Sequence, residues 1–288
     1  PRKSMYTVLI GVGANVVFDP IFIFGFGMGI RGAAVATVVS MSLSAVFVLG
    51  HFFDPRHQVH FRRDSWSLQP RIIRNIVSIG MAPFLMNTAA SVVNVIMNNR
   101  LVENGGDLAI GAFGIVNSYA ILVIMVVMGI CQAMQPIVGY NYGARKYKRV
   151  KDVLLLTMRV ATLAVTVGFV CCETFPGIMV RAFTSDPDLA EMARQGMRLA
   201  YMMWPVVGFQ IVVSTFFQSI GKAYKAIFMG LSRQVIFLIP ALYLFASRFG
   251  LEGIWLSMPF SDSLAAIIGL CFLLREKKIL YGRTSRKV

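Results

Sequence analysis

The sequence has 288 residues, of which 57% are apolar and only 14% are charged, and its mean hydropathy is +0.68. A soluble domain has roughly 45 to 50% apolar residues, so this composition excludes a water-soluble fold and predicts several crossings of a lipid bilayer. The formal net charge of +15 suggests nucleic acid, but the basic residues fall on alternate loops without an aromatic-interleaved patch, so we expect no nucleic-acid partner.

The apolar residues gather in eight segments, each near the roughly 20 residues that a helix needs to cross the hydrocarbon layer. Because the segments are long and continuously apolar, helices are favoured over the shorter alternating strands of a membrane barrel. The predicted fold class is therefore an all-α membrane protein with eight transmembrane helices. These helices are predicted at residues 5–27, 31–53, 75–100, 108–138, 152–175, 193–219, 226–247 and 253–274.

The first two predicted helices contain the best candidate for a cation site. Asp19 lies within a span, where an ionisable side chain costs roughly 2.5 to 3.5 kcal/mol on insertion scales and therefore indicates function. Asn15 lies one turn earlier on the same face, and Thr37 reaches the same depth if the chain turns near Met28. Their oxygen atoms suit Na⁺, and a desolvated carboxylate can exchange a proton instead. The alternative is that Asp19 only hydrogen-bonds within the bundle.

A polar stretch divides the first two predicted helices from the other six, and its many charges mark a loop. We interpret the chain as four parts: the end of an N-terminal lobe, a cytoplasmic linker, a C-terminal lobe of six helices and a basic cytoplasmic tail. These parts are residues 1–53, 54–74, 75–275 and 276–288.

The distribution of lysine and arginine predicts the orientation, since cytoplasmic loops carry the excess of positive charge. The rule assigns the linker, the basic segment 145–151, the tail, and Lys222, Lys225 and Arg233 to the cytoplasmic side. Both ends of the chain are then cytoplasmic, and the expected location is the plasma (inner) membrane, with the bilayer as a partner.

Five other polar residues in predicted spans are candidates for lining a substrate cavity, although each is equally consistent with a hydrogen bond inside the bundle. The four cysteines and three histidines show no metal-ligand spacing, and no nucleophile and base appear together. We therefore expect no metal, no cofactor and no enzyme activity. The cavity candidates are Asn94, Asn98, Gln132, Gln135 and Asp262.

The first and last pairs of predicted helices share a pattern, in which a proline precedes a Gly-x-x-Gly turn by nine or ten residues. Pro20 precedes the turn at residues 29–32, and Pro240 precedes the turn at residues 250–253. The match suggests two similar lobes related by a parallel repeat. Asp19 stands before the first proline and an isoleucine stands before the second, so this carboxylate occurs in one lobe only.

Three stretches of the sequence resemble the MATE family, the multidrug and toxic compound extrusion transporters. Residues 15–37 resemble its fifth and sixth helices, residues 132–147 the signature after its eighth helix, and residues 218–234 the joint between its tenth and eleventh helices. The resemblance implies helices five to twelve of a twelve-helix fold, so we expect a fragment that lacks the first four. It also implies that Asp19, Asn15 and Thr37 match the cation-site positions of that family's N-terminal lobe.

The resemblance implies a secondary active transporter that exports cationic or hydrophobic drugs by alternating access, in exchange for Na⁺ or H⁺. The expected partner is therefore a drug-like small molecule, while nothing in the sequence indicates an oligomeric state. Two alternatives stay open. One is a lipid-linked precursor flippase of the wider superfamily, which usually has a more cationic cavity, and the other is a remnant that does not transport.

Overall fold

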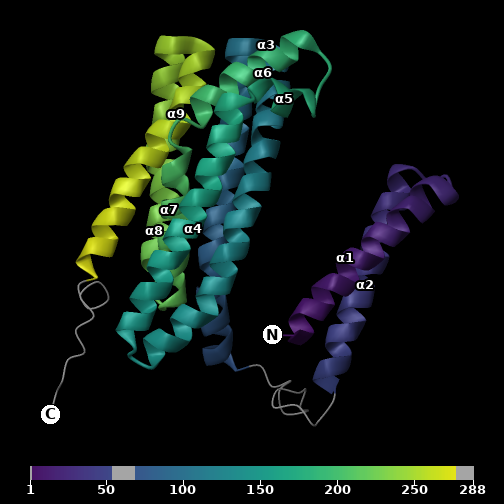
Figure 1. Cartoon of the computed structure of the whole chain (residues 1–288), viewed down its shortest axis with the longest axis vertical. Coiled ribbons are helices and arrows are strands. Elements are labelled where there is room, and N and C mark those ends of the chain that lie inside the picture. Colours follow the sequence, from purple (N-terminus) through teal and green to yellow (C-terminus); the bar gives the residue numbers. More distant parts are fainter. Residues whose placement is uncertain (1, 54–68, 277–288) are drawn as a thin grey trace. The chain divides into compact units, whose positions relative to one another are not determined.

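The computed structural model describes residues 2–53 and 69–276, and within these ranges the chain forms helices and turns but no strand (Figure 1). The all-helical fold class is therefore confirmed. The chain divides into two compact units, Pro1–Asn75 and Ile76–Val288. Most of the predicted linker and nearly all of the predicted tail lie outside the described residues.

The N-terminal unit is a helical hairpin with a π-helical segment before its turn. The helix α1 (Arg2–Pro20) continues into η1 (Ile21–Gly25), and α2 (Ile30–Phe53) runs back along it (Figure 1). Pro20 has no amide hydrogen for an α-helical bond, and the helix continues beyond it with wider turns, in which the Phe26 amide donates to the Ile21 carbonyl at 2.9 Å. Helix geometry thus changes directly after Asp19.

Small residues allow the two helices of this hairpin to approach closely. Gly32, Ala36 and Ser40 lie on one face of α2, and all three are buried. A β-carbon on Gly32 would lie 2.6 Å from the carbonyl oxygen of Phe22, so only glycine fits at this crossing.

The C-terminal unit is a bundle of long helices joined by short turns (Figure 1). Its first helix begins at Pro70, five residues before the predicted start. The predicted helix at 193–219 is two helices, α6 and α7, that meet at a bend of 58°. The elements are α3 (Pro70–Gly143), α4 (Tyr147–Thr174), α5 (Pro176–Arg181), α6 (Pro187–Ala200), α7 (Trp204–Ser219), α8 (Ala223–Leu231), η3 (Ser232–Leu238) and α9 (Ile239–Arg275).

Two of these helices are interrupted by a glycine with a left-handed backbone. In α3 the φ angle of Gly106 is 64°, and in α9 the φ angle of Gly250 is 57°. An α-helix cannot continue through such an angle, which L-residues with a side chain rarely adopt. Each glycine lies in a gap between two predicted spans. Beyond the second one, Gly253 packs against the carbonyl of Phe245 with no room for a β-carbon, as Gly32 does in the hairpin.

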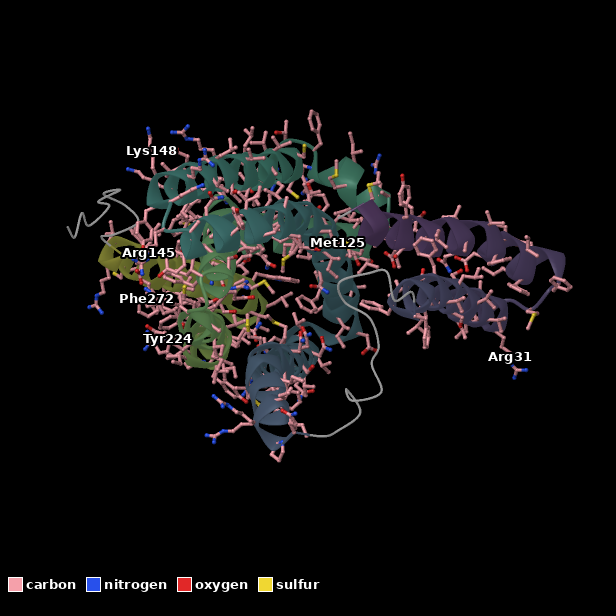
Figure 2. All side chains as sticks on the ribbon, turned by 90° about the horizontal axis from the view of Figure 1, so that it is seen from below. Arg31, Met125, Arg145, Lys148, Tyr224 and Phe272 are labelled. Carbon is pink, nitrogen blue, oxygen red and sulfur yellow. The ribbon has the colours of Figure 1, made fainter. Side chains whose placement is uncertain are left out.

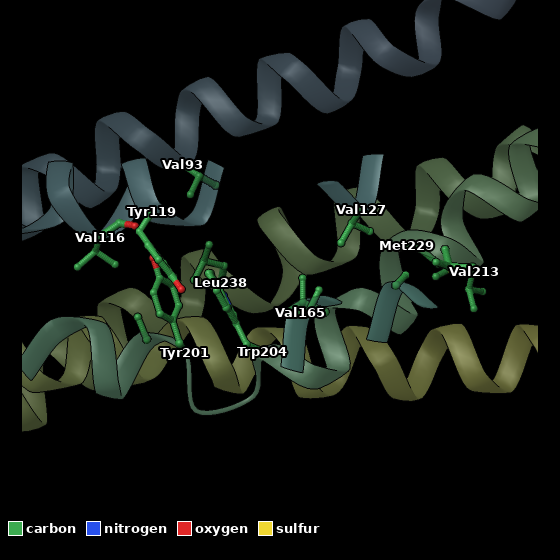
Figure 3. Packing of buried hydrophobic residues seen from close by; sticks show 14 of the residues in the cluster. Val93, Val116, Tyr119, Val127, Val165, Tyr201, Trp204, Val213, Met229 and Leu238 are labelled. Atoms are coloured by element: carbon green, nitrogen blue, oxygen red, sulfur yellow. The ribbon is translucent and has the colours of Figure 1, made fainter. Parts of the chain in front are cut away.

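The core of the C-terminal unit contains a group of three stacked aromatic rings (Figure 3). The rings of Tyr201 and Trp204 lie 3.7 Å apart at the bend between α6 and α7, and the ring of Tyr119 lies 5.7 Å from Trp204. The hydroxyl of Tyr119 donates to the carbonyl of Gly168 at 2.8 Å, and the hydroxyl of Tyr201 donates to the carbonyl of Val116. These bonds satisfy the buried hydroxyl groups and hold the bend in place.

The turn between α3 and α4, the turn between α7 and α8 and the end of α9 lie together at one end of this unit (Figure 1). Arg145 and Lys148 are among the exposed nitrogen-tipped side chains there (Figure 2). The ammonium groups of Lys222 and Lys225 each donate to the same carboxylate oxygen of Glu276 at 2.6 Å. Three connections that are far apart in sequence thus meet at one basic end.

The charges in this cluster shift one another's titration. Partial burial acts to raise the pKa of Glu276, but the hydrogen bonds from the two ammonium groups outweigh it and hold that pKa below its usual value. Burial acts to lower the pKa of Lys222, but the bond to Glu276 outweighs it, so this pKa is raised. Both shifts favour the charged forms and therefore the ion pair.

Within the described residues, five helices are long and apolar enough to cross a bilayer, or six if the bent pair of α6 and α7 counts as one span. Two of the five stretches, Phe84–Gly143 and Ala223–Arg275, contain the glycine breaks and have 60 and 53 residues. The composition and these helices together define a membrane protein that crosses the bilayer several times.

Candidate functional site

Asp19 lies at the end of α1, just before the π-helical segment, and its side chain is half-buried. The amide nitrogen of Asn15 approaches one oxygen of this carboxylate at 3.5 Å, which is at the outer limit of a hydrogen bond. Within residues 2–53 and 69–276, no basic side chain forms an ion pair with Asp19. The structure therefore brings Asp19 and Asn15 together and leaves the negative charge of Asp19 with one weak partner.

Thr37 lies on α2, and its hydroxyl donates to the carbonyl of Ala33 at 2.9 Å. This bond uses the hydroxyl hydrogen and leaves the oxygen free to accept. Thr37 and Asn15 line one hollow of about 420 Å³ between α1 and α2, whereas Asp19 lies one turn beyond Asn15 and outside this lining. The structure thus places two of the three predicted residues at one hollow and the third beside it.

Ser40 is a polar residue of this hollow that the sequence did not single out. It is 2% exposed, and its hydroxyl has no hydrogen-bond partner among the described residues. A buried hydroxyl without a partner costs free energy, so it is a candidate for contact with a ligand. The sequence spacing could have identified this residue, since Ser40 follows Thr37 by three residues and so lies on the same helical face.

The C-terminal unit holds the second carboxylate in a different way. Asp262 on α9 accepts a hydrogen bond from the Nε of Arg233 at 2.5 Å, and the Asp262 side chain is only 4% exposed. Arg233 lies in η3, within the predicted helix at residues 226–247, so the partner of Asp262 comes from inside a helix. An internal arginine neutralises this carboxylate at short range.

Arg233 and Asp262 line a cavity of about 250 Å³ within the C-terminal unit. Of the predicted cavity residues, Asn94 also lies in this lining. Asn98, Gln132 and Gln135 are exposed on α3 and do not line it. Apolar side chains form most of the wall, and three of them are aromatic, Phe113, Tyr201 and Trp204.

Metal-ligating residues do not gather in the described part of the chain, where no group of three or more His, Cys, Asp or Glu lies close enough to hold a metal ion. The arrangement instead combines several apolar helices with two carboxylates, one weakly partnered and one neutralised by arginine. Ionisable side chains at such positions are typical of membrane transporters. The fold therefore defines the class of polytopic helical membrane proteins.

Comparison with known proteins places the chain within this class. The family model described as MatE matches residues 78–244, which is more than half of the chain. The chain belongs to the MATE family.

Two curated relatives illustrate the relationship. The multidrug export protein MepA of Staphylococcus aureus is 29% identical over 283 residues, which cover 96% of this chain and 61% of that protein. MepA of Staphylococcus haemolyticus is 26% identical, with 94% and 59% covered. The chain thus spans about three fifths of the length of these relatives, which by their names are multidrug export proteins.

The fold matches solved structures as well. A structure described as the outward-facing conformation of a multidrug resistance MATE family transporter has a TM-score of 0.85 and 23% identity. The match covers 97% of this chain and 63% of that one. At 23% identity, this likeness shows that the two chains share a fold.

Proposed function

We propose that the protein is a secondary active transporter that exports small drug-like molecules in exchange for a cation bound at Asp19. The observation that carries this proposal is the state of Asp19, a half-buried carboxylate in an apolar helix whose contact with Asn15 is weak. A negative charge in such surroundings is costly unless a cation or a proton compensates it. An exchangeable small cation supplies that compensation.

The proposed site uses Asn15 and Thr37 together with Asp19. The amide oxygen of Asn15 and the hydroxyl oxygen of Thr37 are neutral donors beside the charged one, a set that suits Na⁺. The same carboxylate can take up a proton instead, so the coupling ion is Na⁺ or H⁺. Binding of either ion shifts the balance between inward-open and outward-open states if one state binds it more tightly, and the protein then works by alternating access.

We propose eight transmembrane helices in the chain. The long stretches Phe84–Gly143 and Ala223–Arg275 are each more than twice the roughly 20 residues that one crossing needs. Gly106 and Gly250 each break one of these stretches into two helices. Counting the bent pair of α6 and α7 as one span gives six candidate spans, and dividing the two long stretches at these glycines gives eight.

We place both ends of the chain in the cytoplasm and the protein in the plasma membrane. The basic turn at Arg145 and Lys148 and the pair Lys222 and Lys225 lie at one end of the C-terminal unit (Figure 2). Positive charge gathered at one end of a bundle favours the cytoplasmic side. No cofactor enters this proposal.

The proposed substrates are cationic or hydrophobic drugs. The relatives named above are multidrug export proteins, and the cavity of the C-terminal unit is lined mainly by apolar and aromatic side chains. The apolar part of this wall suits the hydrophobic body of such a drug.

A lipid-linked precursor flippase is the second candidate, and one observation favours it. Arg233 lines the cavity of the C-terminal unit and brings positive charge to it, as expected for a flippase that binds phosphate. Export of a cationic dye separates the two candidates, because a flippase would not move the dye.

Dye export from proteoliposomes tests the proposal. The full-length protein is reconstituted, an ethidium gradient is followed by fluorescence, and an opposing Na⁺ or H⁺ gradient is imposed. We expect Asp19→Asn to lower the gradient-driven rate at least about tenfold, since the coupling depends on a cation bound differently in two states. Asp107→Asn is the matched control, because Asp107 is exposed at the glycine break of α3. Undiminished coupled export by Asp19→Asn would remove this residue from the mechanism.

A further inference from the structure

The cavity of the C-terminal unit exposes a positive charge and hides the negative charge that balances it. Arg233 and Asp262 are the two charged residues among those that line it, in the part of the chain that the structure describes. The side chain of Arg233 is 35% exposed, whereas that of Asp262 is 4% exposed. A ligand that enters the cavity therefore meets the guanidinium and not the carboxylate.

The geometry of the ion pair leaves most of the guanidinium available. Arg233 donates to Asp262 through Nε, and a guanidinium has five N–H donors. The four N–H groups on the two terminal nitrogens have no hydrogen-bond partner among the described residues. Two terminal N–H groups in one plane match the two oxygens of a carboxylate, as in the common bidentate pair.

The wall around this guanidinium suits a flat apolar body. Tyr201 and Trp204 are stacked at 3.7 Å and are fixed by the bend between α6 and α7, and Phe113 lies in the same lining (Figure 3 shows the first two). The hydroxyl of Tyr201 is already bonded to the carbonyl of Val116, so its ring contributes mainly apolar surface. The three aromatic rings and the arginine together suit an apolar ring that carries an anionic group.

The size of the cavity indicates how much of a ligand it holds. Its volume of about 250 Å³ lies just below the roughly 300 to 1,000 Å³ typical of ligand pockets. It therefore accommodates one end of a drug-sized molecule. Arg233 also sits at the start of the π-helical segment η3, a geometry that occurs frequently at functional sites.

We propose that this cavity is a subsite for the aromatic carboxylate end of a transported compound, bound by the terminal nitrogens of Arg233 while Asp262 holds the guanidinium in place. As a statement about substrates, the inference rests on the proposed export function. In physical terms, the cavity of the C-terminal unit binds anionic ligands more tightly than cationic ones.

Equilibrium binding of three matched probes tests the subsite, with the full-length protein in nanodiscs of phosphatidylcholine and no ion gradient. The probes are 2-naphthoate, 2-naphthalenemethanol and 2-naphthylmethylammonium, which share one ring system and differ in charge. We expect the wild type to bind naphthoate at least about tenfold more tightly than the other two, the effect of one charge-assisted bidentate pair. Equal binding of the three probes, or tighter binding of the cation, would overturn the proposal.

Two variants and a control locate the effect. Arg233→Lys keeps a positive charge beside Asp262 but loses the planar fork, and we expect naphthoate affinity to fall about tenfold. Arg233→Gln combined with Asp262→Asn removes both charges without leaving either one unpaired, and we expect the three probes to bind within about threefold of one another. Arg159→Gln is the control, since Arg159 is exposed on α4 outside the lining. Unchanged naphthoate binding by both Arg233 variants would contradict the assignment.

A fourth probe separates the two sources of an anionic group. Two competitors of bound naphthoate are compared, a polyprenyl phosphate and benzoate. If the polyprenyl phosphate displaces naphthoate at the lower concentration, the site binds a lipid phosphate and the proposed aromatic carboxylate is overturned. If only benzoate displaces naphthoate, the proposal is supported. Because these measurements use no gradient, a failure of coupled export at Asp19 leaves their outcome unaffected, and the two proposals fail separately.

Discussion

The two carboxylates within the apolar helices differ in what balances their charge. Asp19 in the N-terminal unit has an amide nitrogen at 3.5 Å, whereas Asp262 in the C-terminal unit has a guanidinium nitrogen at 2.5 Å. A carboxylate that is already neutralised gains little from another cation, while a weakly partnered one gains much. An acidic residue in a span is therefore a candidate for ion coupling only when no permanent cation is beside it.

The largest effect on stability is expected from separating the buried pair. Arg233→Gln leaves the carboxylate of Asp262 buried without its partner, and we expect it to lower the free energy of unfolding by about 3 to 5 kcal/mol. Adding Asp262→Asn should recover most of this loss, because both charges are then absent. Equilibrium unfolding in mixed detergent micelles measures both variants.

Asp19→Asn is the matched change in the other unit. We expect it to alter the free energy of unfolding by less than about 1 kcal/mol, since the bond that it weakens is long and half-buried. A loss of stability at Asp19 as large as that of Arg233→Gln would show that Asp19 is also a structural residue, and the contrast between the two units would fail.

An intermediate effect is expected at the glycine that follows the turn in each unit. Gly32→Ala and Gly253→Ala each place a β-carbon against a backbone carbonyl, that of Phe22 in one case and that of Phe245 in the other. We expect each change to lower the free energy of unfolding by about 1 to 3 kcal/mol, the usual cost of overpacking. The control is Gly114→Ala, at a helical position with open space around it. Tolerance of alanine at Gly253 would show that this approach is not tight.

A loss smaller than that of the glycine variants is expected at the basic end of the C-terminal unit, where Glu276→Gln removes the acceptor of two lysines. We expect a loss of about 1 kcal/mol near neutral pH, in the range of partly exposed ion pairs. Glu276 has a lowered pKa in the folded state, so its contribution is present above the unfolded pKa near 4.3 and is lost as the pH falls through the folded value.

The pKa of Lys222 is raised, so its contribution is present below the unfolded value near 10.4 and is lost as the pH rises through the folded value. Thermal unfolding from pH 3.5 to 11 should therefore show the largest gap between wild type and Glu276→Gln between about pH 5 and pH 10. A gap that does not depend on pH would assign the loss to packing.

Local features of the fold could be predicted from the sequence. Long apolar runs predicted helices, the gap between the runs at 75–100 and 108–138 predicted an interruption near Gly106, and the Gly-x-x-Gly pattern predicted the turn at Gly250. These signals depend on neighbouring residues alone. The spacing of Asn15 and Asp19 likewise predicted their contact. The helical start at Pro70 was missed, since charged residues there resemble a loop, although proline is favoured in the first turn of a helix.

Contacts between distant helices could not be predicted in this way. Asp262 and Arg233 are 29 residues apart and lie on either side of the break at Gly250, so their meeting depends on how two helices pack. The π-helical segment η3 also changes which face Arg233 occupies, because its turns contain more residues than α-helical ones. Buried Ser40 was missed for a related reason, since serine is common on helix faces of every kind.

Cation binding to the full-length protein in detergent measures the role of Asp19 without a substrate or a gradient. The measurement is the number of ²²Na⁺ ions bound, or of protons taken up, per protein molecule. The account predicts that Asp19→Asn abolishes this binding and that the double change Arg233→Gln with Asp262→Asn retains it. Binding that is unchanged in Asp19→Asn and absent in the double variant would contradict the account.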